Sequence, residues 1–201
     1  MIWKTLVPVL VLSALPSASH AIERPGIGGI EEIAELPGWW RAGSNPAGYR
    51  IGADRAVTHS GRASARLVSA QPDPMGFGSL MQVAAAEKYR GKRVRLTGWV
   101  RAANVRRRAG LWMRVDGPSQ DPKQALAVDV MKDRGISGTR GWQRYAIVLD
   151  VGANAADIAF GATLSGAGAI WVDDMRIEEV GRDVPTTAAP RAQNLDFETA
   201  R

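Results

Sequence analysis

Two short segments of the sequence place tryptophan beside arginine in a pattern that can bind a ligand. In the first, Arg95 and Trp99 fall on the same side of an alternating run, and in the second Trp112 shares its side with Arg114 and Asp116. An indole can stack on a sugar ring, while guanidinium and carboxylate groups hydrogen-bond the hydroxyls. These five residues form the predicted ligand-binding set. The alternative is that loops or neighbouring arginines cover both indoles, because tryptophan is mostly buried in folded proteins.

Groups able to do nucleophilic or metal catalysis are scarce in this chain. It has no cysteine, and of its two histidines only His59 lies outside the predicted signal peptide. A thiol nucleophile, a thiolate metal site and a site with two imidazoles are therefore excluded from the mature chain. A Ser-His-Asp triad could use only His59, which stands in a Ser-Gly turn where we expect a structural role.

Catalytic motifs and paired carboxylates likewise give no indication of an enzyme. The G-x-S-x-G, HExxH and P-loop signatures are missing. The pairs Asp173-Asp174 and Glu178-Glu179 are adjacent on predicted strands, so their side chains point to opposite faces and cannot converge on one glycosidic bond. We therefore predict that the protein is not an enzyme.

The sequence predicts that these residues stand on short strands separated by glycine-rich turns. Helical periodicity is scarce, and one turn at Ala84–Tyr89 is the main helical prediction. This spacing predicts an all-β sandwich. The predicted strands are 48–54, 63–69, 77–83, 92–101, 109–116, 124–131, 142–150, 156–164 and 169–179.

Alternation along these strands assigns side chains to the core or to the surface. The aliphatic residues predicted to point inward in the two tryptophan-arginine segments are Val94, Leu96, Val100, Leu111, Met113 and Val115. In the last strand the phase changes between Val172 and Met175. Either a bulge at Asp173-Asp174 resets the register, or Asp173 points inward and is paired or bound to a cation. Trp142 is expected to plug one end of the sandwich.

The ends of the chain predict targeting and linkage rather than folded structure. Lys4, a short apolar run and Ser19-His20-Ala21 predict a signal peptide over 1–21, and the run is too short to span a membrane. We therefore expect a periplasmic or secreted protein without a transmembrane segment after cleavage. Residues 22–47 read as a lead-in, 48–180 as the β-sandwich domain, and 181–201 as a linker-like tail.

Basic residues outnumber acidic ones, with Lys and Arg numbering 26 against 20 Asp and Glu. The segment Arg101–Arg108 carries several of them and is predicted to be a solvated hairpin tip. If it binds anything, export favours anionic glycans or lipid headgroups over nucleic acid.

Four segments together resemble the galactose-binding-like β-sandwich modules related to carbohydrate-binding modules: Tyr89–Arg101, Ala109–Gly117, Gly138–Tyr145 and Trp171–Asp174. Such modules occur as accessory domains of secreted bacterial proteins. The resemblance implies a jelly-roll-type antiparallel β-sandwich. It also implies a structural calcium ion, held by carbonyls of His59–Gly61 and by Asp173 or Asp174. Asn194–Glu198 is similar to the opening segment of such modules although it stands at the tail, so the chain is expected to adjoin a further module.

The function predicted from these observations is that of an exported, non-catalytic module that recognises a glycan or serves as an accessory domain. The alternative is a protein-interaction or assembly domain of a cell-envelope complex, in which Trp99 and Trp112 form a docking patch. A protein partner is expected in the alternative, and nucleic acid in neither.

Overall fold

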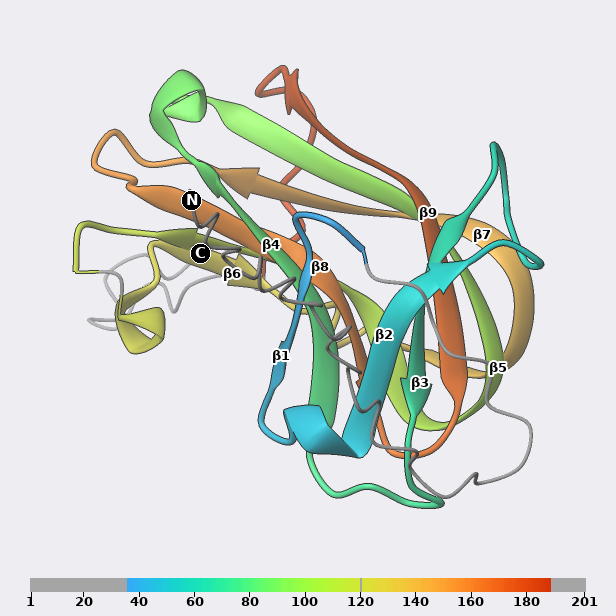
Figure 1. Ribbon diagram of the computed structural model, residues 1–201. Helices are drawn as coiled ribbons and strands as arrows, with labels where there is room; N and C mark the ends of the chain where they lie inside the picture. The colour runs from blue at the N-terminus through green and yellow to red at the C-terminus, as the bar shows by residue number, and fades with distance from the viewer. Residues whose placement is uncertain (1–35, 120, 189–201) are drawn as a thin grey trace, which may run out of the picture. The chain divides into compact units, whose positions relative to one another are not determined.

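One long strand, β5 (Arg93–Asp116), organises the fold of the protein in the computed structural model (Figure 1). Along one edge β5 pairs with β7 (Ile136–Asp150). Along the other edge its first half pairs with β9 (Ala169–Val180) and its second half with β8 (Asp157–Ser165). Because β8 and β9 follow different halves of a curved strand, the sheet separates into two layers that face each other across the core.

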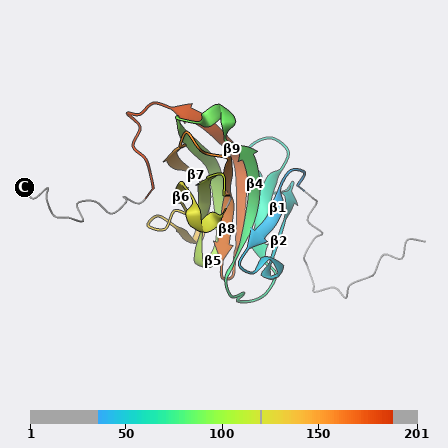
Figure 2. The same cartoon turned by 90° about the vertical axis from the view of Figure 1, so that its left-hand side faces the viewer.

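The structure describes residues 36–119 and 121–188. In strand order the sheet runs β1-β4-β8-β5-β9-β3-β2, with β6 and β7 on the other edge of β5, and every pairing is antiparallel. Figure 2 shows β8 between β4 and β5. The remaining strands are β1 (Trp40–Gly43), β2 (Tyr49–Asp54), β3 (Ser64–Ser69), β4 (Phe77–Ala85) and β6 (Ala127–Asp129). Three 3-10 turns complete the elements: η1 (Pro46–Gly48), η2 (Glu87–Tyr89) and η3 (Pro122–Gln124).

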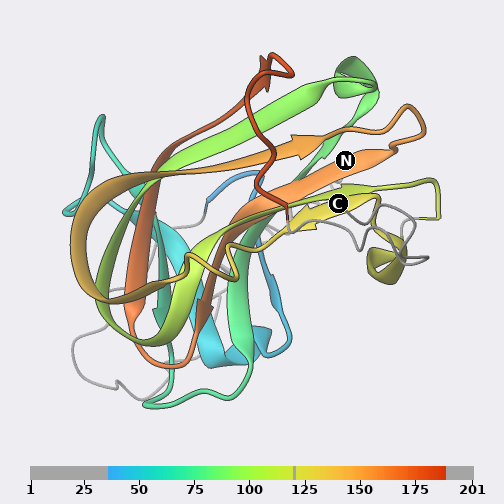
Figure 3. The ribbon, with the colours of Figure 1, turned by 180° about the vertical axis from the view of Figure 1, so that it is seen from behind.

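The bend of β5 corrects the prediction of a hairpin tip at Arg101–Arg108. The chain stays extended through this segment, and β7 follows the same curve beside it (Figure 3). Register shifts against β7 occur between Val100 and Ala109, and Asn104 takes a left-handed φ of 53°. Bulges of this kind increase local twist, so one strand serves both layers. Arg106 and Arg107 are exposed and Arg108 is half-buried, whereas Val105 and Ala109 on either side of them are buried in the core.

The core lies between the two layers and is built from the inward positions that alternation predicts. Val94, Leu96 and Val100 in the first half of β5, and Leu111, Met113 and Val115 in the second half, are all nearly inaccessible and belong to one cluster. The fold predicted from sequence, an all-β antiparallel sandwich, is confirmed. It is nearly closed into a barrel because β5 and β7 cross from one layer to the other.

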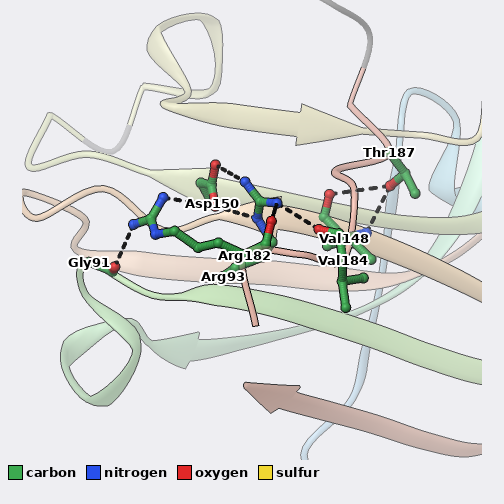
Figure 4. A network of polar contacts seen from close by, with 7 residues as sticks. All are labelled: Gly91, Arg93, Val148, Asp150, Arg182, Val184 and Thr187. Atoms are coloured by element: carbon green, nitrogen blue, oxygen red, sulfur yellow. Dashed lines mark hydrogen bonds and ion pairs between the residues drawn. The ribbon is translucent and has the colours of Figure 1, made fainter. Parts of the chain in front are cut away.

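The folded region extends beyond the predicted domain at both ends. β1 pairs with β4 although it lies in the segment 22–47 that was expected to be a lead-in. At the other end, Arg93 donates hydrogen bonds to the carbonyls of Arg182 and Val184. The Thr187 N–H donates to the Val148 carbonyl, and the Val148 N–H donates to Thr187 Oγ1 (Figure 4). Residues 181–188 therefore lie against the edge of β7 instead of forming a linker.

Arg93 fixes this C-terminal segment through a second interaction. Its Nε and Nη2 donate to both carboxylate oxygens of Asp150 at the end of β7, at 2.8 and 3.0 Å, so Arg93 joins β7 to the C-terminal segment. This bidentate hydrogen bond lowers the pKa of the Asp150 carboxyl. Arg182, in the same C-terminal segment, donates a hydrogen bond to the Gly91 carbonyl.

Other element boundaries also differ from the predictions. The predicted strand 124–131 is reduced to β6, which ends before the left-handed φ of 51° at Met131. The predicted strand 142–150 lengthens to β7. The helical turn expected over 84–89 is the 3-10 turn η2. No helix among the described residues is long and apolar enough to cross a membrane. The predicted signal peptide and residues 189–201 lie outside the described residues.

Candidate ligand-binding site

Three tryptophans lie on one outward face of the layer formed by β2, β3, β9, β7 and the first half of β5. Trp99 in β5 is paired with Asp173 in β9 and with Arg144 in β7. Trp171 stands two residues before Asp173, and Trp142 two residues before Arg144, so both point to the same side as Trp99. We call this surface, with Trp99, Trp142 and Trp171 at its centre, the tryptophan face.

The loop between β2 and β3, residues 55–63, folds back over this face and places His59 against two of the indoles. The imidazole stacks on Trp99 with ring centroids 4.0 Å apart and an angle of 17° between the planes. It meets Trp142 edge to face at 5.7 Å. The three rings form one aromatic group that is half-buried rather than enclosed in the core.

A β-bulge in β9 holds the loop in place. The register against β5 shifts between Thr97 and Trp99, and Asp174 takes a left-handed φ of 49°. The bulge predicted at Asp173-Asp174 is thus confirmed. It turns the Asp173 carboxylate toward the loop, where Oδ2 accepts hydrogen bonds from the backbone N–H groups of His59 and Ser60 at 2.9 and 3.1 Å.

Asp174 binds the side chains of the same loop. Its Oδ2 lies 3.0 Å from His59 Nδ1 and accepts a hydrogen bond from Ser60 Oγ at 2.9 Å. These two hydrogen bonds, that from His59 first, hold the pKa of the Asp174 carboxyl below its usual range. An ionised carboxylate only accepts hydrogen bonds, so the proton of the imidazole lies on Nδ1.

Serine, histidine and aspartate therefore meet here, but not in the arrangement of a hydrolase triad. In a triad the serine hydroxyl binds the histidine nitrogen that does not contact the aspartate. Here Ser60 and His59 both bind the same oxygen of Asp174. The imidazole cannot take the proton of the serine in this geometry, so the cluster holds the loop and does not generate a nucleophile.

Trp171, whose side chain is only 9% exposed, is not available for stacking and anchors the other end of the loop. Its Nε1 donates to Asp54 Oδ2 at 2.7 Å, and Asp54 Oδ1 accepts from the N–H groups of Ala56 and Val57. Burial opposes ionisation of Asp54, but the bonds from Trp171 and the two amides, with Arg66 nearby, bring its pKa below the usual value. The guanidinium carbons of Arg66 and Arg101 lie 5.3 and 5.9 Å from the centre of the Trp171 ring.

The predicted ligand-binding set is divided by the bend of β5. Trp99 and Arg95 lie on the tryptophan face, whereas Trp112, Arg114 and Asp116 lie on the outward face of the other layer. The expectation that all five share one surface is wrong, because alternation within each half of β5 does not show that the halves belong to different layers.

The other layer does not present Trp112 as a stacking platform. Trp112 is only 9% exposed, and its Nε1 donates to Ser79 Oγ at 2.8 Å. Arg114 donates to both oxygens of Asp116, which is buried. On the tryptophan face Arg95 is likewise engaged, with Glu178. Four of the five predicted residues are thus occupied by internal contacts.

The residues present do not fit the calcium ion that the resemblance implies. At the turn His59–Gly61, N–H groups of His59 and Ser60 face the carboxylate of Asp173, and an N–H group repels a cation that a carbonyl would bind. Asp174 is bound to two side chains of the same loop. Among residues 36–119 and 121–188, no group of three or more His, Cys, Asp or Glu side chains could hold a metal ion.

Sequence reasoning missed the central role of His59 and Trp142. The turn containing His59 was expected to be structural, and it does hold the loop, but it also builds the aromatic group with Trp99. Trp142 was expected to be a plug and instead lies on the outward face of β7. The available signal was that the outward phase of the predicted strand 142–150 contains Trp142 and Arg144.

Comparison of the sequence with known proteins gives one informative relative. No family model matches the chain. It is 43% identical over 154 residues to a protein of Bacillus subtilis (strain 168) named as an uncharacterized HTH-type transcriptional regulator, YbfP. The match covers 76% of this chain and 51% of that protein, so the chain spans about half the length of this curated relative.

Solved structures identify the architecture. The CBM22-1 xylan-binding domain of Paenibacillus barcinonensis Xyn10C matches with a TM-score of 0.54 and 10% identity, over 74% of this chain and 90% of that one. A family 16 carbohydrate-binding module matches with a TM-score of 0.51 and 13% identity, over 68% and 93%. The fold is the galactose-binding-like β-sandwich of carbohydrate-binding modules. The enzymatically active domain of tailspike protein 4 from bacteriophage CBA120 contains a similar fold, with a TM-score of 0.55 and 14% identity over 72% of this chain and 20% of that one.

Proposed function

We propose that this protein is an exported, non-catalytic module that binds a glycan on the tryptophan face. The observation that carries the proposal is the aromatic group of Trp99, Trp142 and His59, whose half-buried rings lie on one outward face of a sheet. Rings with an apolar surface and a polar edge suit the stacking of pyranose rings. The shared fold of the xylan-binding domain and the family 16 module supports this function.

Two features support a non-catalytic role. The candidate nucleophile Ser60 and the candidate base His59 both bind the same oxygen of Asp174, which leaves no activated hydroxyl. The pairs Asp173-Asp174 and Glu178-Glu179 lie in β9 and serve structural contacts. We expect no hydrolysis of ester, peptide or glycoside substrates, and activity that disappears in His59→Ala would contradict this part of the proposal.

Export rests on the sequence of residues 1–21. The expected cleavage after Ala21 would leave Ile22 as the first residue of the mature protein. Mass spectrometry of the full chain expressed in its bacterial host, with the cytoplasm, periplasm and medium separated, tests this directly. Recovery of the uncleaved chain in the cytoplasm would contradict export and leave glycan binding unaffected.

Affinity electrophoresis tests glycan binding. Gels containing a neutral or an acidic soluble polysaccharide should retard the wild-type protein, and Trp142→Ala should migrate as in an empty gel. Trp40→Ala is the matched control, because Trp40 is 43% exposed in β1 on the other layer. Retardation by no polysaccharide, or equal loss in both variants, would overturn the proposal.

The Bacillus subtilis relative supports a second candidate, the ligand-sensing part of a transcriptional regulator. A helix-turn-helix needs two α-helices, and the described residues contain only three 3-10 turns of three residues each. The described β-sandwich would therefore sense a ligand and leave DNA binding to another part of such a protein. Specific retardation of duplex DNA by the chain alone would contradict this assignment.

A further inference from the structure

Three arginines on the tryptophan face have no acidic partner. Arg101, Arg144 and Arg176 are exposed. Among the described residues, no carboxylate lies within 4.0 Å of their guanidinium nitrogens. None of the three guanidinium groups forms a salt bridge within the described ranges, although the charge of Arg176 contributes to the lowered pKa of Asp174.

The same strands neutralise their cations at the other end. Salt bridges there join Lys92 to Glu179, Arg93 to Asp150 and Arg95 to Glu178, each at 2.8 Å. Acidic residues are thus placed opposite every cation of β5 at the end remote from Trp99. Beside the aromatic rings the acidic residues Asp54, Asp173 and Asp174 bind the loop or Trp171, and none forms a salt bridge with Arg101, Arg144 or Arg176.

The three guanidinium groups surround the aromatic group. Arg101 is two residues beyond Trp99 in β5 and lies over the Trp171 ring at 5.9 Å. Arg144 is paired with Trp99 in the register of β7, and its Nη2 lies 3.5 Å from Thr97 Oγ1. Arg176 is paired with Thr97 from the opposite side, in β9. Cations from three strands therefore border one patch of indole surface.

The carboxylates of this face are already used by the fold. Asp54 accepts hydrogen bonds from Trp171, Ala56 and Val57. Asp173 and Asp174 hold the loop that carries His59. A buried donor is also left over: Nε of Arg66, beside the Trp171 ring, has no hydrogen-bond partner. The guanidinium groups of this face therefore keep hydrogen-bond donors that no carboxylate of the described residues binds.

We infer that the ligand of the tryptophan face is an anionic saccharide, one whose sugar units carry carboxylate or sulfate groups. This inference rests on the proposed function and specifies its ligand. Guanidinium groups bind planar or tetrahedral oxyanions through charge-assisted, often bidentate hydrogen bonds. The pyranose ring then packs on the aromatic group of Trp142 and His59, while its acidic substituent is bound by Arg101, Arg144 or Arg176. A neutral glycan would leave all three guanidinium groups without a salt-bridge partner.

Two pairs of polysaccharides that differ only in charge test the inference. The first pair is polygalacturonate and its methyl-esterified form, which isolates the carboxylate. The second is dextran sulfate and dextran, which isolates the sulfate. Binding of the full chain, measured by isothermal titration calorimetry at two salt concentrations, should be at least about tenfold tighter for an acidic member than for its neutral counterpart, and salt should weaken it. The preferred pair distinguishes carboxylate from sulfate.

Charge-matched variants separate the site from general attraction to a basic protein. Arg101→Gln and Arg144→Gln should each weaken binding to the preferred acidic polymer about tenfold, the size expected for a lost charge-assisted hydrogen bond. Lys132→Gln removes the same charge from an exposed position between β6 and β7 and should change binding less than twofold. Unchanged melting temperatures confirm that the variants fold.

The outcomes that overturn the inference differ from those that overturn glycan binding. Equal affinity for charged and neutral members of both pairs would refute an anionic ligand and leave the glycan-binding proposal standing. Binding to no polysaccharide would refute both. An equal loss in Lys132→Gln would show that attraction is unspecific, and tighter binding of a single-stranded oligonucleotide than of every polysaccharide would favour nucleic acid instead.

Discussion

The imidazole of His59 lies parallel to the indole of Trp99, with 4.0 Å between the ring centroids. This contact joins a loop to a sheet position 40 residues later, and it covers one surface of the indole that sequence analysis assigned to ligand stacking. The aromatic surface offered to a ligand is therefore shared by the loop and the sheet. Its shape depends on how firmly Asp173 and Asp174 hold the loop.

Replacing Asp174 with Asn should loosen this loop. Asn tolerates the left-handed backbone that Asp174 adopts, so the variant removes the negative charge with little backbone strain. The hydrogen bonds from His59 and Ser60 then go to a neutral oxygen and are weakened, at a cost of about 1–2 kcal/mol. We expect a lower melting temperature and faster amide exchange over residues 56–60. Asp133→Asn is the control, because that side chain is 82% exposed, and equal effects in both variants would contradict the anchoring role.

The stability of the protein should fall in acid because of its partnered carboxylates. The pKa values of Asp54, Asp150 and Asp174 are lowered in the folded state. The unfolded chain then binds more protons than the folded one near the usual aspartate pKa of about 3.9. The stabilisation is fully present above that pH and is lost as the pH falls through the lower, folded values. Urea unfolding at pH 6, 5, 4 and 3 should show this decline.

The same titration can be assigned to one residue. Asp174→Asn removes one of the three carboxylates, so the difference in unfolding free energy between wild type and variant should shrink as the pH falls below about 4. A difference that stays constant from pH 6 to pH 3 would show that the folded-state pKa of Asp174 is not lowered.

Much of the fold could be predicted because local alternation determines which side chains are buried. Val94, Leu96 and Val100 occupy the core as the period of two requires. The bend at Asn104 could not be predicted in the same way, since a run of arginines fits a loop tip as well as an exposed strand. Because the bend was not predicted, Trp99 and Trp112 were wrongly assigned to one surface.

The site was less predictable because its contacts join residues that are far apart in the sequence. The bulge at Asp173-Asp174 could be expected from the phase change, but not that its carboxylates would bind a loop more than 110 residues earlier. Alternation places Trp142 and Arg144 on one face of a strand. Only the register of β7 against β5 shows that this face also carries Trp99.

The burial of Trp112 predicts a large stability cost when the ring is removed. Its side chain is 9% exposed and bound to Ser79, so Trp112→Ala should cost about 3–5 kcal/mol of unfolding free energy. Trp112→Phe should cost less, because most of the packing is kept and only the hydrogen bond is lost. Chemical unfolding measures both, with the exposed Trp40→Ala as the control. A near-neutral Trp112→Ala would show that the ring is accessible and would restore it as a binding candidate.

The bend of β5 depends on close approach of the hairpin that joins β8 to β9, and a glycine pair tests this. Gly168 has a φ of 131°, and a Cβ there would lie 2.7 Å from Val105 Cα and 2.8 Å from the Asn104 carbonyl oxygen. Gly138 has a φ of 72° with no atom within 4 Å of such a Cβ. Gly138→Ala should therefore cost only the backbone strain of about 1–2 kcal/mol, and Gly168→Ala about 1–3 kcal/mol more from the steric clash. Equal unfolding free energies for the two variants would show that the hairpin does not pack against the bend.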